Sequence, residues 1–386
     1  MDKITLPERP DWRATAKEAG FTFADMHGEP YWDETSAYRF TLRQIEEDIE
    51  DPSTDLHNMC RDAVAEIVGS EWMMDRMGIP APHRDLIADS WRRNEPEIYG
   101  RLDLAYDGKG PAKLLEYNAD TPTSLYESAS FQWQWLEDQL AAGILPQGAD
   151  QFNGIHEALV ERFRALFAPD TDIHFTAVAN NPEDYATVEA MAWAAREAGM
   201  GAHYSDLDRL GVTKQGQFVD AEDKVIGTLF KLYPWEDLLR DDYARHIRGS
   251  GCLFLEPAWK ALVSNKAILP VLWEMFPGHP NLLPAWFDDD PQAAQLGTSF
   301  VRKPIYSREG ANVELVSAGV TLVAEQGPYG AEGFIRQALA PLPNFSGQYP
   351  VLGSWLVDHT PCGLSIREDE NPITGNTSRF LPHAIL

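Results

Sequence analysis

The stretch from Gly100 to Ala129 constrains the fold of this chain more than any other feature of the sequence. It holds two runs of alternating apolar and polar residues, 101–106 and 113–118, on either side of the turn-rich segment 107–111. Glycine supplies the positive φ that a chain reversal needs, and alternation with a period of two is typical of strands. The sequence therefore predicts a β-hairpin here.

The predicted hairpin sets two acidic side chains against each other. Because strand side chains alternate between faces, pairing that is symmetric about the turn brings Asp103 opposite Glu116. The same register brings Arg101 opposite Asn118, on the same face. Two opposed carboxylates repel unless a cation or a proton lies between them, and Mg²⁺ prefers carboxylate, amide and phosphate oxygens. A metal–nucleotide site is one interpretation of this face; the other is a solvated face on which Arg101 neutralises the acids.

The composition favours a folded chain of two or three lobes. The 386 residues are 44% hydrophobic and 11% aromatic, which is enough for a sizeable core. A net charge of −28 disfavours nucleic acid as a partner, and no apolar run approaches the length of a membrane span. The 3 cysteines are isolated and the first residues lack the apolar core of a signal peptide, so we expect a reducing, cytoplasmic location.

Patterns along the chain divide it into three regions, 1–154, 155–250 and 251–386. The first region has helical periodicity, for example over 38–48 and 61–77, and it ends after the hairpin. Large apolar residues at helical spacing are more typical of a core than of a cofactor site.

The second region alternates strand and helix patterns. Apolar runs over 173–179 and 225–231 flank an amphipathic helix pattern over 185–198. Strand, helix, strand is typical of a small α/β unit with a parallel sheet.

The third region carries most of the remaining chemistry. Ser264 or Asn265 is a plausible cap for an apolar helix, and a strand pattern ends at Lys303 before the loop 307–312. A loop with small polar residues and a glycine offers backbone N–H groups to phosphate oxygens, although neither a P-loop nor a GxGxxG motif is present. Near the end, Arg367 precedes the cluster 376–379, which suits a polyphosphate pocket. Surface lysines and a hairpin with a polar turn are the alternatives.

Taken together, these segments resemble the synthetase part of the glutathionylspermidine synthase family. The matching segments span nearly the whole chain: RLD at 101–103, LEYNADT at 115–121, FKLYPWE at 230–236, EPAWK at 256–260, SNKAILPVLWEMFPGHPNLLPA at 264–285, VRKPIYSREGAN at 301–312 and NTSRF at 376–380. The resemblance implies an α+β / α/β architecture, an ATP-grasp fold with an inserted small α/β substrate domain of the pre-ATP-grasp kind. It implies ATP and Mg²⁺, with small-molecule carboxylate and amine substrates joined as an amide through an acyl-phosphate.

The resemblance also implies roles for individual residues. Asp103, Glu116 and Asn118 would bind Mg²⁺; Lys266, Lys303, Ser307, Gly310, Asn312 and Gln337 would bind the nucleotide, with Lys260 as a neighbour; Arg101 and Arg367 would face the acyl-phosphate; and Thr121, Thr123, Glu183 and Asp184 would contact the substrates.

The substrates themselves are less constrained than the reaction. Pro122 departs from the serine-rich stretch of the family, so glutathione and spermidine are the substrates of the family rather than of this chain. A ligase for another acid and amine, such as a peptide or cell-envelope precursor, is an alternative. A nucleotide-binding protein without catalysis is a further one.

Overall fold

The computed structural model describes residues 1–26, 28–375 and 378–386, and within these ranges the fold is a mixed α/β fold. Its helices are α1 (Trp12–Glu18), α2 (Leu42–Ile45), α3 (Asp51–Ile67), α4 (Glu71–Arg76), α5 (Arg84–Arg92), α6 (Gln132–Ala141), α7 (Ile155–Leu166), α8 (Pro182–Glu197), α9 (Trp235–Leu238), α10 (Ala244–Ile247), α11 (Lys260–Val263) and α12 (Ile268–Met275). Short 3₁₀ or π segments are η1 (Glu46–Glu50), η2 (Ala81–His83), η3 (Glu127–Phe131), η4 (Leu207–Arg209) and η5 (Pro291–Leu296).

The strands form three larger sheets and some smaller ones. The central sheet runs in the order β20 (Arg379–Leu381), β19 (Thr360–Asp369), β18 (Tyr349–Val357), β5 (Tyr99–Ala105), β6 (Lys113–Asn118). The outer sheet runs β13 (Ala285–Phe287), β17 (Phe334–Ala338), β14 (Phe300–Pro304), β15 (Glu314–Ser317), β16 (Val320–Ala324). The parallel sheet runs β12 (Leu253–Leu255), β11 (Thr228–Leu232), β7 (Asp172–Ala177), β8 (Gly201–Tyr204). The smaller sheets are β1 (Asp2–Thr5), β4 (Ser36–Phe40), β21 (His383–Ile385); β9 (Gly211–Val212), β10 (Phe218–Val219); and β2 (Asp25–Met26), β3 (Glu29–Pro30).

The predicted hairpin is confirmed as β5 and β6. Asp103 pairs with Glu116 and Arg101 pairs with Asn118, in the register expected from the turn. Gly108 in the turn has φ of +85°, a conformation that favours glycine. The register then shifts, because Leu104 pairs with Leu114 and leaves Leu115 as the extra residue of a β-bulge.

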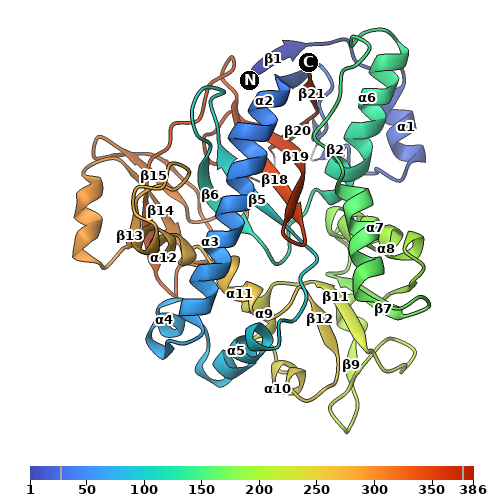
Figure 1. Cartoon of the computed structure of the whole chain (residues 1–386), viewed down its shortest axis with the longest axis vertical. Helices are drawn as coiled ribbons and strands as arrows, with labels where there is room; N and C mark the ends of the chain where they lie inside the picture. Colours follow the sequence, from blue (N-terminus) through green and yellow to red (C-terminus); the bar gives the residue numbers. More distant parts are fainter. Residues whose placement is uncertain (27, 376–377) are drawn as a thin grey trace.

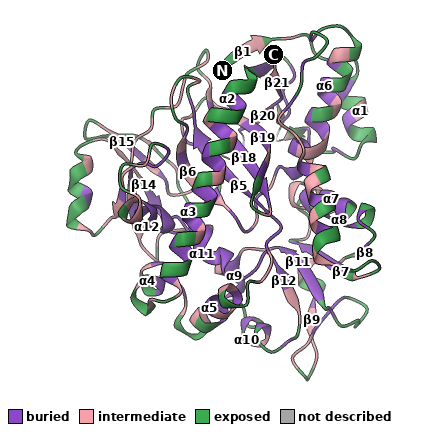
Figure 2. Ribbon diagram, viewed as in Figure 1, coloured by how far each residue is buried: buried purple, intermediate pink, exposed green. Residues whose placement is uncertain are grey.

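The long helix α3 covers one face of the central sheet (Figure 1). Its buried side chains, which include Leu56, Ala63 and Ile67, share a core with sheet residues such as Leu102 and Ile366. Figure 2 shows the same division, with buried sheet strands and exposed outer helix faces.

The predicted helix over 38–48 is wrong in its first part. Residues up to Phe40 form strand β4, which pairs with β1 and β21 and is nearly all buried. Thr41 then caps α2 through its side chain, which accepts from the Gln44 N–H, so the helix begins only after it.

The predicted helix over 61–77 is also broken. It covers the end of α3 and the separate helix α4. The two are divided at Gly69 and Ser70, and the Ser70 hydroxyl caps α4 by accepting from the Met73 N–H.

The predicted small α/β unit with a parallel sheet is confirmed. Strands β7, β8, β11 and β12 are parallel to one another, and α7 and α8 pack against the sheet (Figure 1). Strand β11 begins at Thr228, later than the run over 225–231 suggests. Strand β12 joins this sheet from beyond residue 250.

The outer sheet lies against the free edge of β6. Lys303 on β14 donates to the Leu115 carbonyl and Gln337 on β17 donates to the Leu114 carbonyl, so the two sheets meet along this edge. The β15–β16 hairpin forms the far edge of the outer sheet (Figure 1). In the part of the chain that the structure describes, no helix is long and apolar enough to cross a membrane.

Candidate active site

Two cavities meet at the paired carboxylates of the β5–β6 hairpin. One, of about 270 Å³, is mainly apolar and lies between the hairpin and the outer sheet. The other, of about 340 Å³, is polar and lies between the hairpin and the carboxyl end of the parallel sheet. Both are lined by Asp103, Glu116, Ser307, Glu309, Gly310 and Thr374.

The carboxylates at this junction are held by positive or donor groups. Arg101 binds Asp103 with two nitrogens, at 2.7 and 3.1 Å, and donates to the Thr123 carbonyl at 2.9 Å. The Asn118 amide N–H group donates to Asp103 at 2.9 Å and to Glu116 at 3.3 Å. A Cβ at Gly353, which pairs with Asp103, would lie 2.6 Å from Arg101 Cδ, so a glycine there leaves room for the arginine.

These oxygens fit a hard divalent cation. Asp103 and Glu116 present two carboxylates on one face, and the Asn118 amide lies between them. Carboxylate and amide oxygens are the donor set that Mg²⁺ accepts, with substrate phosphate completing it. In the structure the Asn118 N–H group and Lys266 contact these carboxylates.

Two buried lysines lie beside the carboxylates. Lys266 binds Glu116 at 2.9 Å and donates to the Ser307 carbonyl at 2.9 Å. Burial opposes ionisation of Glu116, but Lys266 and then Lys303 outweigh it and hold the pKa of Glu116 at about 2. Burial lowers the pKa of Lys303 to about 8, although the negative charge of Glu116 acts to raise it. Two ammonium groups beside two carboxylates can neutralise the charge of a polyphosphate and its metal ion.

The apolar cavity suits a flat ring system. It is lined by Leu115, Val301, Val313, Leu315, Leu322, Leu339, Leu342, Val351 and Ile373, with Lys266, Lys303 and Gln337 at its polar side. Leu322, on strand β16, is 62% exposed although it faces this cavity. A ligand that carries an apolar ring and phosphates would place the ring here and the phosphates at the lysines.

The polar cavity brings together three of the four residues predicted to contact substrate. Thr121, Thr123 and Asp184 line it with Arg101 and Arg367. Burial, with the charge of Glu183, raises the pKa of Asp184 to about 6.

Two atoms at the polar cavity are ready for a ligand. Among the described residues, Ser307 Oγ and Arg367 Nε are buried without a hydrogen-bond partner. Buried polar atoms are normally paired, so a ligand that pairs with them is favoured.

Arg308 is a site residue that the sequence analysis did not single out. Its guanidinium donates to Thr121 Oγ1 at 2.8 Å and to Glu236 Oε1 at 2.9 Å, and so joins the loop 307–312 to the parallel-sheet region. Further lining residues that were missed are Asn181, Tyr233, Asp237 and Glu309. The only sequence signal for Arg308 was its position next to Ser307 in the SREGAN segment.

A few predicted residues lie elsewhere. Asn312 and Glu183 line neither cavity; the Asn312 side chain accepts from the Tyr329 N–H instead. Lys260 is buried in a cluster with Glu97 and Glu256, at 2.9 and 2.7 Å. Asn376 and Thr377 lie outside the described residues.

Of the two predicted cap residues, Asn265 accepts from the Ala267 N–H through its side-chain oxygen at 2.8 Å, just before α12, whereas Ser264 does not cap a helix. Its hydroxyl accepts from the N–H groups of Ala119 and Asp120, at 3.0 and 2.9 Å. It therefore fixes the loop that follows β6, where Thr121 and Thr123 lie.

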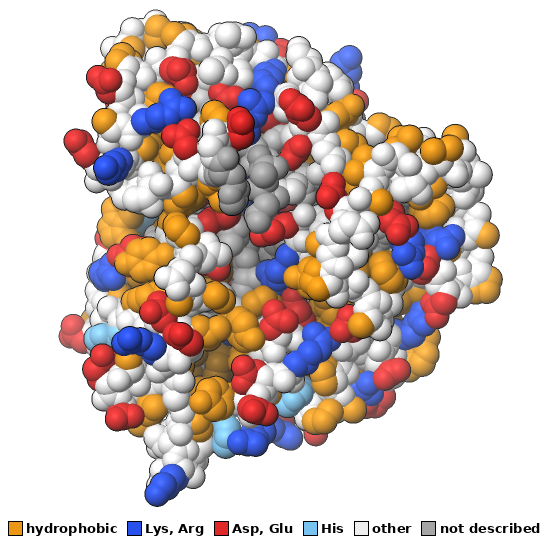
Figure 3. All heavy atoms as spheres, turned by 180° about the vertical axis from the view of Figure 1, so that it is seen from behind, with side chains coloured by type: hydrophobic (Ala, Val, Ile, Leu, Met, Phe, Trp, Pro, Cys, Tyr) orange, Lys and Arg blue, Asp and Glu red, His pale blue; other side chains and the backbone are white. Residues whose placement is uncertain are grey.

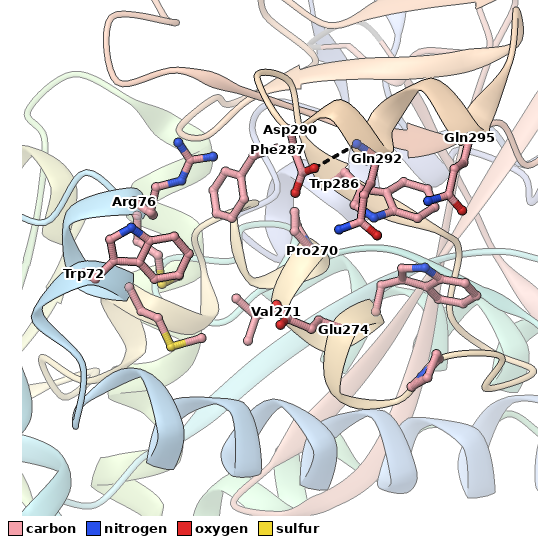
Figure 4. A pocket seen from close by; sticks show the side chains of 14 residues that line it. Trp72, Arg76, Pro270, Val271, Glu274, Trp286, Phe287, Asp290, Gln292 and Gln295 are labelled. Carbon is pink, nitrogen blue, oxygen red and sulfur yellow. Dashed lines mark hydrogen bonds between the residues drawn. The ribbon is translucent and has the colours of Figure 1, made fainter.

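A larger cavity, of about 560 Å³, lies apart from this site (Figure 4). It is formed by α4, α12, β13 and η5, and its lining includes Trp72, Trp286 and Glu274. None of the predicted site residues lines it, so it is not the candidate active site.

On the face shown in Figure 3, acidic and basic side chains are interspersed.

Comparisons with known proteins show the family of this chain. The family model "Glutathionylspermidine synthase preATP-grasp" matches residues 3–386. A Haemophilus influenzae protein named "Putative acid–amine ligase" is 41% identical, with 99% of both chains covered. Trypanothione synthetase of Crithidia fasciculata is 27% identical, with 85% of this chain and 53% of that protein covered.

The bifunctional glutathionylspermidine synthetase/amidase of Escherichia coli is 26% identical, with 89% of this chain and 58% of that protein covered. The chain thus spans little more than half of these two synthetases. Among solved structures, a glutathione synthetase-like effector of Globodera pallida shares the fold, with a TM-score of 0.58, 13% identity and coverage of 99% and 100%. The predicted family is confirmed: this chain belongs to the glutathionylspermidine synthase family.

Proposed function

We propose that this protein is an ATP-dependent carboxylate–amine ligase with an ATP-grasp fold. The observation that carries the proposal is the junction of the two cavities, where Asp103 and Glu116 lie beside Lys266 and Lys303. An apolar cavity for a base opens on one side of this junction and a polar cavity for two small substrates opens on the other. The acid–amine ligase and synthetase relatives support the same class of reaction.

The proposed reaction has two steps. A substrate carboxylate oxygen attacks the γ-phosphorus of ATP, so that ADP leaves and an acyl-phosphate forms. The amine nitrogen then attacks the acyl carbon, phosphate leaves, and the nitrogen loses a proton as the amide forms. Positioning and charge neutralisation are the main contributions of a protein to phosphoryl transfer.

Each group at the junction has a part in these steps. Asp103, Glu116 and Asn118 would hold Mg²⁺, which neutralises phosphate charge when it is bound. Lys266 and Lys303 would bind the phosphates, and Ser307 and Gly310 would close over them from the loop. Arg101 and Arg367 would neutralise the charge of the acyl-phosphate, and Asp184 would bind a cationic group of the amine.

Gly310 suits a loop that packs this closely. It has φ of +70°, and a Cβ there would lie 2.6 Å from Ile373 Cγ2. Glycine therefore allows loop 307–312 to lie against residues 373–374 at the cavity edge.

Two sets of substrates are consistent with the site. Glutathione and spermidine are the first candidates, since synthetases named for them are relatives of this chain. A different acid and amine is the second, favoured because the relative that matches end to end is named only as an acid–amine ligase.

The test is ADP release with ATP and Mg²⁺ over a panel of acids and amines, with hydroxylamine added to trap the acyl-phosphate. ADP and hydroxamate that form only with a particular acid establish the first step, and an amide that forms only when an amine is added establishes the second. Nucleotide binding without turnover for any pair would instead favour a binding protein.

A further inference from the structure

Gln337 is bound on both sides of its amide group within the apolar cavity. Its Oε1 accepts from the Lys303 ammonium at 2.8 Å, and its Nε2 donates to the Leu114 carbonyl at 3.0 Å. The side chain is 2% exposed. Each polar atom of the amide therefore has a protein partner, and one N–H and one oxygen lone pair remain.

The partner of Gln337 is one of the two lysines at the junction. Lys303 and Gln337 lie on neighbouring strands of the outer sheet, and Val301 pairs with Gln337, so the two side chains are diagonal neighbours on one face. Lys303 also donates to the Leu115 carbonyl at 2.8 Å. Its ammonium is therefore held by one acceptor from β17 and one from β6.

The acceptors on β6, the carbonyls of Leu114 and Leu115, lie beside a β-bulge on an edge strand. Strand β6 is the edge of the central sheet, and Leu115 is the extra residue that β5 does not pair. Bulges next to active sites re-aim groups in this way. Leu115 also precedes Glu116, so the bulge places the Lys303 ammonium close to the carboxylate pair.

We propose that Gln337 is a positioning residue that holds the Lys303 ammonium toward the phosphates of the nucleotide and does not read its base. This inference rests on the proposed function, because it needs a polyphosphate ligand at Lys303. It gives Gln337 a different task from the direct nucleotide contact that the family resemblance implies. The base would then be held by the apolar side chains of the cavity and by backbone groups.

The experiment compares the binding of ATP and of inorganic triphosphate, each with Mg²⁺, by calorimetry. The proteins are the full-length wild type, Gln337→Met, Lys303→Met, the double variant, and Gln295→Met as a matched control at an exposed glutamine of the same region. Methionine keeps the length of the side chain and removes both hydrogen bonds. Triphosphate has no base, so it separates lysine positioning from base contact.

Gln337→Met is expected to weaken ATP and triphosphate alike, by about tenfold, the effect of losing one hydrogen bond to a charged group. In the Lys303→Met background, Gln337→Met is expected to raise the dissociation constants for both ligands by less than about a further twofold, because the ammonium that Gln337 positions is gone. Gln295→Met is expected to bind both ligands as the wild type does.

Two results would overturn the inference while the wild type still binds ATP. A loss confined to ATP would make Gln337 a base contact, and full additivity with Lys303→Met would make it independent of the lysine. A wild type that binds neither ligand would overturn the proposed function and the inference with it. If Gln337→Met does not fold by circular dichroism, Gln337→Glu replaces it; its charge neutralises Lys303, so ATP and triphosphate are again expected to weaken together.

Discussion

The Lys266 ammonium lies 2.9 Å from the Glu116 carboxylate and donates to the Ser307 carbonyl at the same distance. Glu116 belongs to the edge strand of the central sheet, whereas Ser307 follows strand β14 of the outer sheet. A single buried side chain therefore links the carboxylate pair to the loop that closes over it. Ligand phosphate would compete with both partners of this lysine.

Replacing Glu116 should remove catalysis and leave the fold. Glu116→Gln keeps the shape of the side chain but removes the charge that the metal ion and Lys266 require. We expect ADP release to fall by at least about 100-fold, the scale of losing one transition-state charge contact. Asp107→Asn, in the exposed hairpin turn, is the matched control. Turnover that survives in Glu116→Gln at normal melting temperature would remove this carboxylate from the mechanism.

Leu322 should contribute to ATP affinity through the apolar cavity. Leu322→Ser removes an apolar side chain that is 62% exposed without a ligand, and we expect KM for ATP to rise by about tenfold with little change in kcat. Val320 is the control, since it is 60% exposed on the same strand but does not line the cavity. Equal effects of Val320→Ser and Leu322→Ser on KM would mean that β16 does not cover the nucleotide.

Amine binding should weaken in acid because of Asp184. Burial raises the pKa of this carboxyl to about 6, so it is charged above that pH and loses its charge as the pH falls through it. The amine stays protonated over the same range. We expect KM for the amine to rise as the pH falls from 7 to 5. In Asp184→Asn, KM should be high and independent of pH over this range. Glu189→Gln, an exposed change on the same helix, should keep the wild-type profile.

The stability of the fold should depend on pH through His383. The ring is fully buried, accepts from the Phe152 N–H at Nε2 and contacts Gln132 at Nδ1. Burial lowers its pKa from 6.5 to about 3, so the unfolded chain binds a proton below pH 6.5 that the folded chain does not.

The free energy of unfolding should therefore fall as the pH falls from 6.5 toward 3, by up to about 1.4 kcal/mol per pH unit from this group. Urea unfolding of the wild type and of His383→Gln is measured at several pH values. The contribution of His383 is the difference between the two proteins in the slope of the free energy of unfolding against pH. Identical slopes would show that the buried ring is not the cause. His246→Gln, at a half-exposed position, serves as the control.

The sequence predicted the local part of the site well. The register of Asp103 with Glu116 follows from a period of two and a glycine turn, both of which are local properties. The bulge at Leu115 was not predicted, nor were the bonds from Lys303 and Gln337 to the carbonyls beside it, because these residues reach β6 from the outer sheet, far away in the sequence. The same limit applies to Arg308 and Glu236, which meet only after the chain has folded.

The errors in secondary structure have a similar cause. Tyr38 and Phe40 carry large, mainly apolar side chains that suit a helix face or a buried strand equally well. Pairing with β1 and β21, at the two ends of the chain, decides for the strand. Ser264 was one of two predicted helix caps because its hydroxyl suits that task, but the N–H groups that it accepts from belong to the loop after β6.

The pairing of Asp103 with Gly353 means that the β5–β6 hairpin gains its neighbouring strand β18 late in synthesis. When β5 and β6 leave the ribosome, β18 has not yet been made, so β5 has an open edge and its two opposed carboxylates have neither Lys266 nor Lys303 beside them. Contacts so distant in sequence form slowly, and open strand edges expose a nascent chain to wrong pairing. The two opposed carboxylates of this hairpin disfavour its pairing with a wrong strand during that wait.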